Sequence, residues 1–325
     1  MRIDFKRLRS RLEQLLATRR RAQCWVVADL QASRMLAVCV APARPGERPV
    51  VLAASALEFN GAAPEAAALA TFAHELQPAR QRWALLLPRD DYRLSMMPAP
   101  EVPAAELAQS LRWQLSTTLD FPAEDAAIDF IDIPTKPWQP ERASELYVVA
   151  ARGAAVNVQA ALFRSAHLNL QAIDIRETAQ RNVGMLLERD GELLVLVAFC
   201  DDEVRISFNW QRELYMDRLI AEPSVHDETP ERRAAACERI QLQVQRSLDA
   251  VRADYPFMQA ARIVLAGAPE GFRAALQVAV FDPVDELDPD SLFDLSRTPD
   301  LHDMRTFMRH FHALGVALRD REDIA

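Results

Sequence analysis

Apolar residues in this chain recur with two different periods, which predicts a protein built from both strands and helices. Runs of strand length lie at 24–30, 34–40, 50–59 and 83–87. A helix is expected over 64–76, with Pro64 in its first turn, where proline is tolerated. The first quarter of the chain is therefore predicted to be an α/β unit.

The stretch 98–165 has an order of elements of its own. A helix is predicted over 103–119 by leucines at steps of four: Leu107, Leu111, Leu115 and Leu119. Strands are expected over 127–133 and 146–151, and a second helix over 154–166. We interpret this stretch as a subdomain inserted into a larger lobe.

The remainder of the chain repeats the layout of the first quarter. A strand at 170–175 precedes a helix at 177–187, and three consecutive strands follow at 193–198, 203–209 and 213–220. Thr229 and Pro230 are expected to start a long helix. The last predicted elements are a strand at 263–266 and helices at 270–280 and 302–318. This recurrence predicts a duplicated α/β lobe.

Residues 1–21 form a basic segment with helical periodicity. One apolar stripe contains Phe5, Leu8, Leu12, Leu15 and Leu16. Eight basic and two acidic residues give the segment a net charge of +6. Such a helix can lie on an anionic membrane surface, with Arg2, Phe5, Lys6 and Arg9 as contacts. The alternative is packing against the rest of the chain, whose net charge is −15.

The composition excludes several classes of function. Only 8 of 325 residues are glycine, and no G-x-G-x-x-G or G-x-x-x-x-G-K-[ST] motif occurs. Because loops that cradle phosphate need glycine for close backbone approach, nucleotide enzymes are disfavoured. The net charge of −9 argues against a nucleic-acid surface. No run of 18 apolar residues is present, so a cytoplasmic chain without a membrane span is expected.

The residues with reactive side chains form no catalytic pattern. Asp90 and Asp91 follow Pro88 and are expected to form a turn. Ser33 and Ser207 lack the glycines of a nucleophile elbow. The cysteines, which lack C-x-x-C spacing and are expected to be buried thiols, are Cys24, Cys39, Cys200 and Cys237. His310 and His312 would point to different faces of a helix, so no metal site is predicted. We expect neither an enzyme nor a cofactor.

Five segments in a particular order resemble the PilM/MshI family of pilus assembly. These are WALLLPRDDY at 83–92, the prolines of 98–103, ELAQSLRWQL at 106–115, LDFP at 119–122 and DFIDIP at 129–134. Weaker matches at 170–175, 212–220, 243–249 and 313–319 extend the resemblance over most of 22–320.

The resemblance implies an actin-like fold, with duplicated ribonuclease H-like lobes and an inserted α+β subdomain in the first lobe. The first lobe would comprise 22–97, 166–188 and 302–325. The insert would be 98–165, and the second lobe 189–301.

The resemblance also places a nucleotide site, which looks degenerate here. The first strand-turn keeps Asp29 but has Gln31 where glycine is expected. The second phosphate hairpin has Val197 and Phe199, and the ring of Phe199 would take the place of a phosphate. The adenosine-side turn keeps only Gly267. We therefore predict that ATP does not bind, although a shifted alignment would offer Asp201 and Asp202 as the missing acid.

In relatives, a cleft beside the insert receives an extended cytoplasmic peptide from a bitopic membrane protein. The aromatic and apolar candidates for that contact are Trp113, Leu119, Phe121 and Trp138. The resemblance thus implies a scaffold of a type IV or MSHA-type pilus machine, peripheral at the inner membrane. Its partners would be a PilN-like protein and, as a second candidate, the assembly ATPase. The alternatives are an ATP-binding actin-like protein and a carbohydrate kinase relative.

Overall fold

The computed structural model describes residues 24–31, 34–43, 46–58, 66–76, 81–134, 144–200, 203–222, 225 and 229–319. The predicted N-terminal helix over 1–21, with Arg2, Phe5, Lys6 and Arg9, lies outside these residues. Ser33, Trp138 and the Asp201–Asp202 pair also lie outside them.

The first lobe contains a five-stranded sheet in the order β3-β2-β1-β4-β8. Its strands are β1 (Cys24–Leu30), β2 (Arg34–Ala41), β3 (Val50–Glu58), β4 (Gln81–Leu86) and β8 (Leu170–Asp174). β1 pairs antiparallel with β2 and parallel with β4. Every residue of β1 is buried, because the strand lies in the middle of the sheet and both of its faces are covered.

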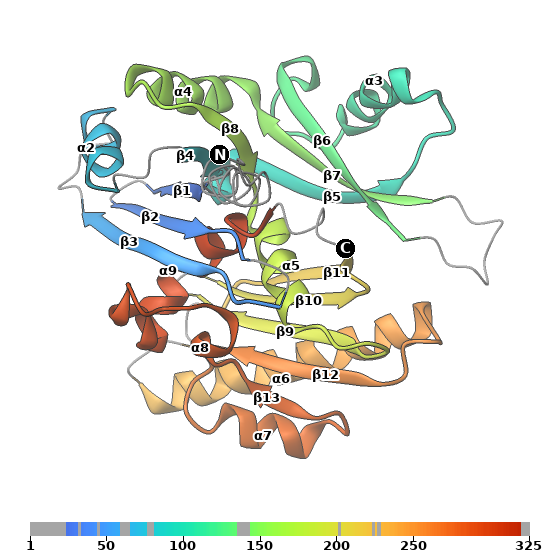
Figure 1. The fold of residues 1–325 in the computed structure, drawn as a ribbon. Coiled ribbons are helices and arrows are strands. Elements are labelled where there is room, and N and C mark those ends of the chain that lie inside the picture. Colours follow the sequence, from blue (N-terminus) through green and yellow to red (C-terminus); the bar gives the residue numbers. More distant parts are fainter. Residues whose placement is uncertain are drawn as a thin grey trace, which may run out of the picture.

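The second lobe repeats this arrangement in the order β11-β10-β9-β12-β13. Its strands are β9 (Leu193–Phe199), β10 (Val204–Trp210), β11 (Glu213–Ile220), β12 (Ala261–Ala266) and β13 (Val284–Glu286). β9 matches β1 in pairing, since it is antiparallel to β10 and parallel to β12, and it is also fully buried. The predicted duplication of an α/β lobe is confirmed (Figure 1).

Two helices lie between the sheets and join the lobes (Figure 1). These are α5 (Arg176–Leu187) and α9 (Met304–Val316). One hydrophobic core runs through this layer and includes Trp25 and Val27 of β1 together with Leu194 and Leu196 of β9. Gly315 is needed in α9, because a side chain there would collide with the carbonyl oxygen of Ala179 in α5.

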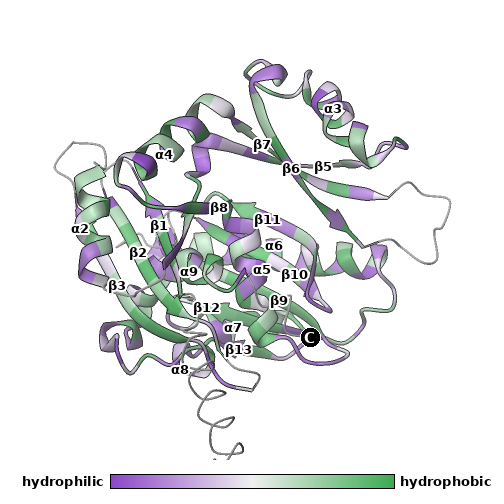
Figure 2. Cartoon of the chain, turned by 45° about the horizontal axis from the view of Figure 1, so that its top comes forward, coloured by the Kyte–Doolittle hydropathy of each residue, from purple (hydrophilic) through white to green (hydrophobic). Residues whose placement is uncertain are grey.

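The outer faces of the sheets are covered by the remaining helices. In the first lobe these are α2 (Ala66–Leu76) and α4 (Gly153–Ser165). In the second lobe they are α6 (Pro230–Asp254) and α7 (Phe272–Ala279), and a short helix, α8 (Pro289–Leu292), precedes α9. Figure 2 shows β2 and β3 as largely hydrophobic. Within the described part of the chain, every helix is too short or too polar to span a bilayer.

The insert is a three-stranded antiparallel sheet in the order β5-β7-β6, with α3 (Ala104–Leu115) packed on it. Its strands are β5 (Tyr92–Pro98), β6 (Ala126–Ile133) and β7 (Glu145–Arg152). The sequence did not predict β5 and assigned 92–97 to the first lobe, whereas the structure pairs this strand with β7. The other domain limits stay predictions.

Helix α3 ends at Leu115, four residues earlier than predicted. The hydroxyl of Ser116 donates to the carbonyl of Trp113, and the hydroxyl of Thr118 donates to that of Leu115. Such local side-chain bonds compete with further helical turns. Leu119 therefore follows a turn, although it still packs against the core of the insert.

Candidate functional site

A groove lies between the inserted sheet and the first lobe, with a volume of about 200 Å³. One wall is formed by residues 127–131 of β6, together with Val149 and Ala151 of β7. The other wall is formed by Leu87, Ile173, Ile175 and Thr178, while Val156 of α4 also contributes. The groove thus follows the length of β6 and is lined mainly by aliphatic side chains.

Strand β6 is an edge strand, and this gives the groove its chemistry. β6 pairs with β7 from Ala126 to Ile133, and the sheet order leaves its other edge without a strand partner among the described residues. An edge of this kind presents backbone N–H and C=O groups that can pair with an added strand. Phe130 of β6 is 37% exposed although it is a large aromatic residue. The groove can therefore hold an extended, apolar peptide.

Two carboxylates line the groove, and Asp174 is the one that is paired with an arginine of the protein. Burial raises the pKa of the Asp174 carboxyl, whereas Arg319, 3.2 Å away, and the Thr178 hydroxyl act in the opposite direction. Asp129 accepts a hydrogen bond from the backbone of Phe130 at 2.9 Å. Asp174 is thus paired within the protein, and Asp129 leaves an exposed carboxylate at the edge of the groove.

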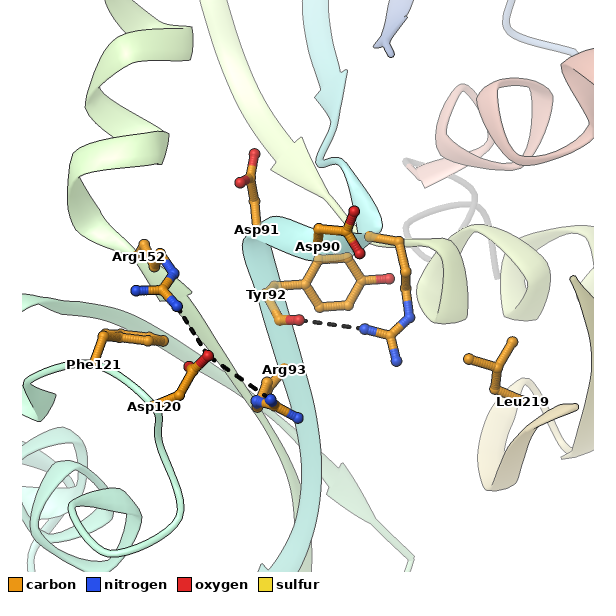
Figure 3. Close-up of a pocket in the computed structure, with 9 residues that line it drawn as sticks. Asp90, Asp91, Tyr92, Arg93, Asp120, Phe121, Arg152 and Leu219 are labelled. Atoms are coloured by element: carbon orange, nitrogen blue, oxygen red, sulfur yellow. Dashed lines mark hydrogen bonds and ion pairs between the residues drawn. The ribbon is translucent and has the colours of Figure 1, made fainter. Parts of the chain in front are cut away.

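A second cavity, of about 310 Å³, lies at the start of β5 and is lined by charged groups (Figure 3). Asp120 bridges Arg152 at 3.0 Å and Arg93 at 3.9 Å. The Arg152 guanidinium lies 4.6 Å from the centre of the Phe121 ring. Asp90 and Asp91 line the same cavity from the short turn Arg89–Asp91, so the turn predicted for them is confirmed.

The structure separates the residues predicted to bind a partner. Trp113 is 78% exposed on α3, and Leu119 packs into the core of the insert. Phe121 lines the charged cavity and not the apolar groove. Together with Trp138, these three residues stay a prediction. The residues that line the groove were missed, because Ile128 and Phe130 look like any alternating strand in the sequence.

In the first lobe, the two predicted nucleotide positions contact each other. Asp29 is buried at the end of β1. The Gln31 amide donates to its carboxylate at 2.8 Å and accepts from Arg34 at 2.6 Å. Gln31 therefore binds the acid that a metal-bound water would otherwise contact.

The positions in the second lobe are packed as well, but not as expected. Phe199 was expected to place its ring where a phosphate would lie. Its ring instead packs edge-to-face on Phe272 at 5.0 Å, and Val197 lies in the same core. Gly267 has a φ of +70°, and a side chain there would meet Met308 at 2.6 Å and the Phe199 carbonyl at 3.1 Å. Val197 and Phe199 are thus part of the core of the second lobe, and Gly267 lies against α9.

A buried charge cluster, which no pattern in the sequence indicates, connects the two lobes and the insert. Arg205 of β10 is fully buried and contacts Glu177 at 2.8 Å, Asp217 at 2.7 Å and Glu203 at 3.1 Å. The Tyr92 hydroxyl donates to Glu177 at 2.7 Å. Residues from β5, α5, β10 and β11 are thus connected through Arg205 and Glu177.

The same environment shifts several pKa values. Burial raises the pKa of Tyr92, and the charge of Glu177 adds to this effect. Burial, followed by the charges of Arg176 and Arg205, lowers the pKa of His312. The pKa of Asp217 is raised to about 7 by burial, against the opposing effect of Arg205. None of these groups lies in a pattern that would complete a catalytic mechanism.

Two related α/β lobes, each with a mixed five-stranded sheet, and a small antiparallel insert define an actin-like fold. The PilM–PilN type IV pilus biogenesis complex contains a chain of this fold with a TM-score of 0.66 and 17% identity, over 90% of this chain and 97% of that one. The predicted resemblance to PilM is thus confirmed at the level of the fold.

Two further solved structures are less similar. The cytoplasmic domain of EpsL, an inner-membrane component of the Vibrio cholerae type II secretion system, gives a TM-score of 0.47 at 12% identity, over 76% of this chain and 84% of that one. A Bacteroides thetaiotaomicron protein with an actin-like ATPase fold and unknown function gives 0.49 at 11% identity, over 95% and 99%. No family model and no curated protein sequence matches the chain.

Proposed function

We propose that this chain is a scaffold of a type IV or MSHA-type pilus assembly machine. In this proposal it binds the cytoplasmic tail of a bitopic, PilN-like inner-membrane protein. The observation that carries the proposal is the apolar groove beside edge strand β6, in a chain whose fold matches the PilM chain of a complex with PilN. The assembly ATPase is a second candidate partner.

The mode of binding follows from the groove. An extended segment would pair its backbone with the free edge of β6 and place alternate side chains against the aliphatic wall. Because most of the groove is lined by aliphatic side chains, apolar side chains are favoured at the contacting positions. The partner would thus contribute a strand.

We further propose that the protein works without nucleotide and is not an enzyme. The support is the packing of Gln31 on Asp29 and of Met308 on Gly267.

The basic segment 1–21 would hold the protein at the inner-membrane surface. We expect that removal of residues 1–21 abolishes salt-sensitive binding to anionic vesicles and leaves stability unchanged. A large fall in melting temperature on truncation, with a full-length protein that does not bind the vesicles, would contradict this proposal.

The experiment on the groove uses a fluorescent peptide of the candidate partner's cytoplasmic segment. Phe130→Ala removes the exposed ring of β6, and Val156→Glu places a charge on the opposite wall. Both variants are expected to weaken binding at least tenfold. The matched control is Phe281→Ala in the second lobe, which removes an equally large but fully exposed ring.

Normal binding by both groove variants, with intact circular dichroism, would overturn the groove assignment. Trp113→Ala is included because the sequence favoured that residue. A loss confined to Trp113→Ala would move the site to the outer face of α3.

A further inference from the structure

Asp129 is an acidic residue in the middle of β6, on the side of the strand that faces the groove. It lines the groove together with Ala127 and Ile131, which lie two residues before and after it. Because side chains alternate along a strand, these three residues share one face of the inserted sheet. An exposed carboxylate thus lies between two apolar side chains, on a strand whose outer edge has no strand partner among the described residues.

The paired side of Asp129, toward β7, offers it no counter-charge. The residue directly opposite is Val149, and the diagonal neighbours are Tyr147 and Ala151. One carboxylate oxygen of Asp129 accepts a hydrogen bond from the backbone of Phe130 at 2.9 Å. Among the described residues, no basic side chain forms an ion pair with Asp129. The open edge of β6 is therefore the side from which a counter-charge can approach.

Asp174, the other carboxylate of the groove, is in a different environment. It is paired with Arg319 at 3.2 Å, and its side chain is only 11% exposed. Its charge is thus compensated within the protein. Of the two groove carboxylates, Asp129 is the one whose charge is open to a ligand.

A strand added at the edge of β6 would place one of its side chains directly opposite Asp129. Directly opposite residues on one face of a sheet have Cβ atoms about 4.5–5.5 Å apart, and opposite charges at this distance stabilise the pairing. An apolar side chain there would remove water from the carboxylate and give nothing in return, which costs free energy. A charged residue that points inward on an edge strand therefore disfavours strands that do not match it.

We propose that Asp129 determines which strand binds in the groove, because it favours a lysine or arginine directly opposite it. This inference rests on the proposed function and specifies the partner segment: a basic residue with apolar residues two positions before and after it. The aliphatic stem of the basic side chain would lie along the aliphatic wall, and its charged end would reach the carboxylate. Cytoplasmic segments next to membrane spans are rich in lysine and arginine, so a bitopic protein is a suitable source.

The test is a double-mutant cycle between Asp129 and the basic residues of the partner, measured with the full chain at low ionic strength. The probe is the fluorescent peptide of the candidate partner's cytoplasmic segment. Each of its lysines and arginines is replaced in turn by a neutral analogue, norleucine for lysine and citrulline for arginine. In wild type we expect one replacement to weaken binding about two- to fivefold, as for other cross-strand charge pairs. In Asp129→Asn the same replacement should have no effect.

Two further variants connect the effect to this one carboxylate. Asp129→Lys is expected to reverse the preference, so that a peptide with glutamate at the coupled position binds more tightly than the unmodified peptide. Asp132→Asn is the matched control, because it removes the same charge from the same strand. Asp132 is exposed, points to the opposite face of β6 and does not line the groove. In this control each replacement should act as it does in wild type.

Tighter binding of every peptide by Asp129→Asn, the unmodified one included, would overturn the inference and show that Asp129 only protects the edge. Equal effects of each replacement in wild type and in Asp129→Asn would also overturn it. If Phe130→Ala and Val156→Glu still weaken binding in either case, the groove assignment holds and only the role of Asp129 fails. A peptide that does not bind wild type would overturn both proposals.

Discussion

The region between the lobes and the groove beside β6 are built in opposite ways. Between the lobes, the guanidinium of Arg205 is fully buried and three carboxylates surround it. At the groove, aliphatic side chains and the free edge of β6 are left open. The first region is thus completed by the protein's own residues, whereas the second is the region at which we propose that another chain binds.

This difference indicates which region of this actin-like fold is open to a ligand. Among the positions that the resemblance assigns to a nucleotide, Gln31 binds Asp29, and Gly267 lies against Met308 of α9. A ligand there would have to displace these contacts. No described strand pairs with that edge of β6, so an added strand exchanges hydrogen bonds to water for hydrogen bonds to the protein, each with a net value of about 0.5–1.5 kcal/mol.

The largest effect is expected from Arg205→Met. Removing the guanidinium leaves Glu177, Glu203 and Asp217 buried without their shared counter-charge. The free energy of unfolding should fall by about 3–5 kcal/mol, as for other broken buried ion pairs. Urea unfolding measures this change.

The control is Arg189→Gln. Arg189 forms a surface ion pair with Glu192 at 4.0 Å, and its side chain is 62% exposed. Its loss should change stability by less than about 1 kcal/mol. Equal effects of the two changes would contradict the structural role of the cluster.

A pH effect should arise from Asp217, whose pKa is raised to about 7. Because an unfolded aspartate titrates near 4, the folded protein holds this proton more tightly. The free energy of unfolding therefore falls as pH rises through this window, on the order of 2 kcal/mol between pH 5 and 7.

The measurement is the difference in stability between wild type and Asp217→Asn over pH 5–8. His312, whose pKa is lowered, acts in the opposite direction and is common to both proteins. A difference that does not vary with pH would show that Asp217 is ionised throughout.

Two glycines with similar φ angles allow the cost of a steric clash to be measured apart from the cost of backbone strain. At Gly267, φ is +70° and a side chain would meet Met308 at 2.6 Å; at Gly271, φ is +80° and nothing lies within 4 Å. Gly267→Ala should cost about 2–3 kcal/mol, and Gly271→Ala about 1 kcal/mol. If both cost the same in thermal unfolding, the region between the lobes is less closely packed than described.

Millimolar Mg-ATP is expected to leave the melting temperature unchanged. A ligand at 100 times its dissociation constant would add about 2.7 kcal/mol to the free energy of unfolding. A clear rise in melting temperature would favour the alternative of an ATP-binding actin-like protein. It would also require Gln31 to release Asp29.

Much of the fold could be predicted because its strands are apolar runs of the right length. Strands β1 and β9 are buried on both faces and were therefore recognisable. Strand β5 was missed, since Tyr92–Pro98 mixes arginine and serine with methionine. The helix α3 was predicted to be too long because Leu119 continues its leucine spacing. The hydroxyls of Ser116 and Thr118 instead form local hydrogen bonds where the helix ends.

The candidate sites could not be predicted in the same way. Whether β6 lies at an edge is decided by its pairing with β7 alone, which no local pattern reveals. The charge cluster joins residues as far apart as Tyr92 and Asp217, and single charged residues within strands look like solvent-facing positions. The resemblance supplied the fold and a partner, but its aromatic candidates Trp113 and Phe121 lie on different surfaces.

The most direct test of the account is whether the partner's cytoplasmic segment pairs with β6 as a strand. Two peptides of this segment would be compared by fluorescence anisotropy, each N-methylated at alternate residues in one of the two registers. N-methylation removes backbone donors and keeps every side chain. The account predicts that one register loses binding at least tenfold and that the other binds like the unmodified peptide. Equal binding in both registers would contradict it.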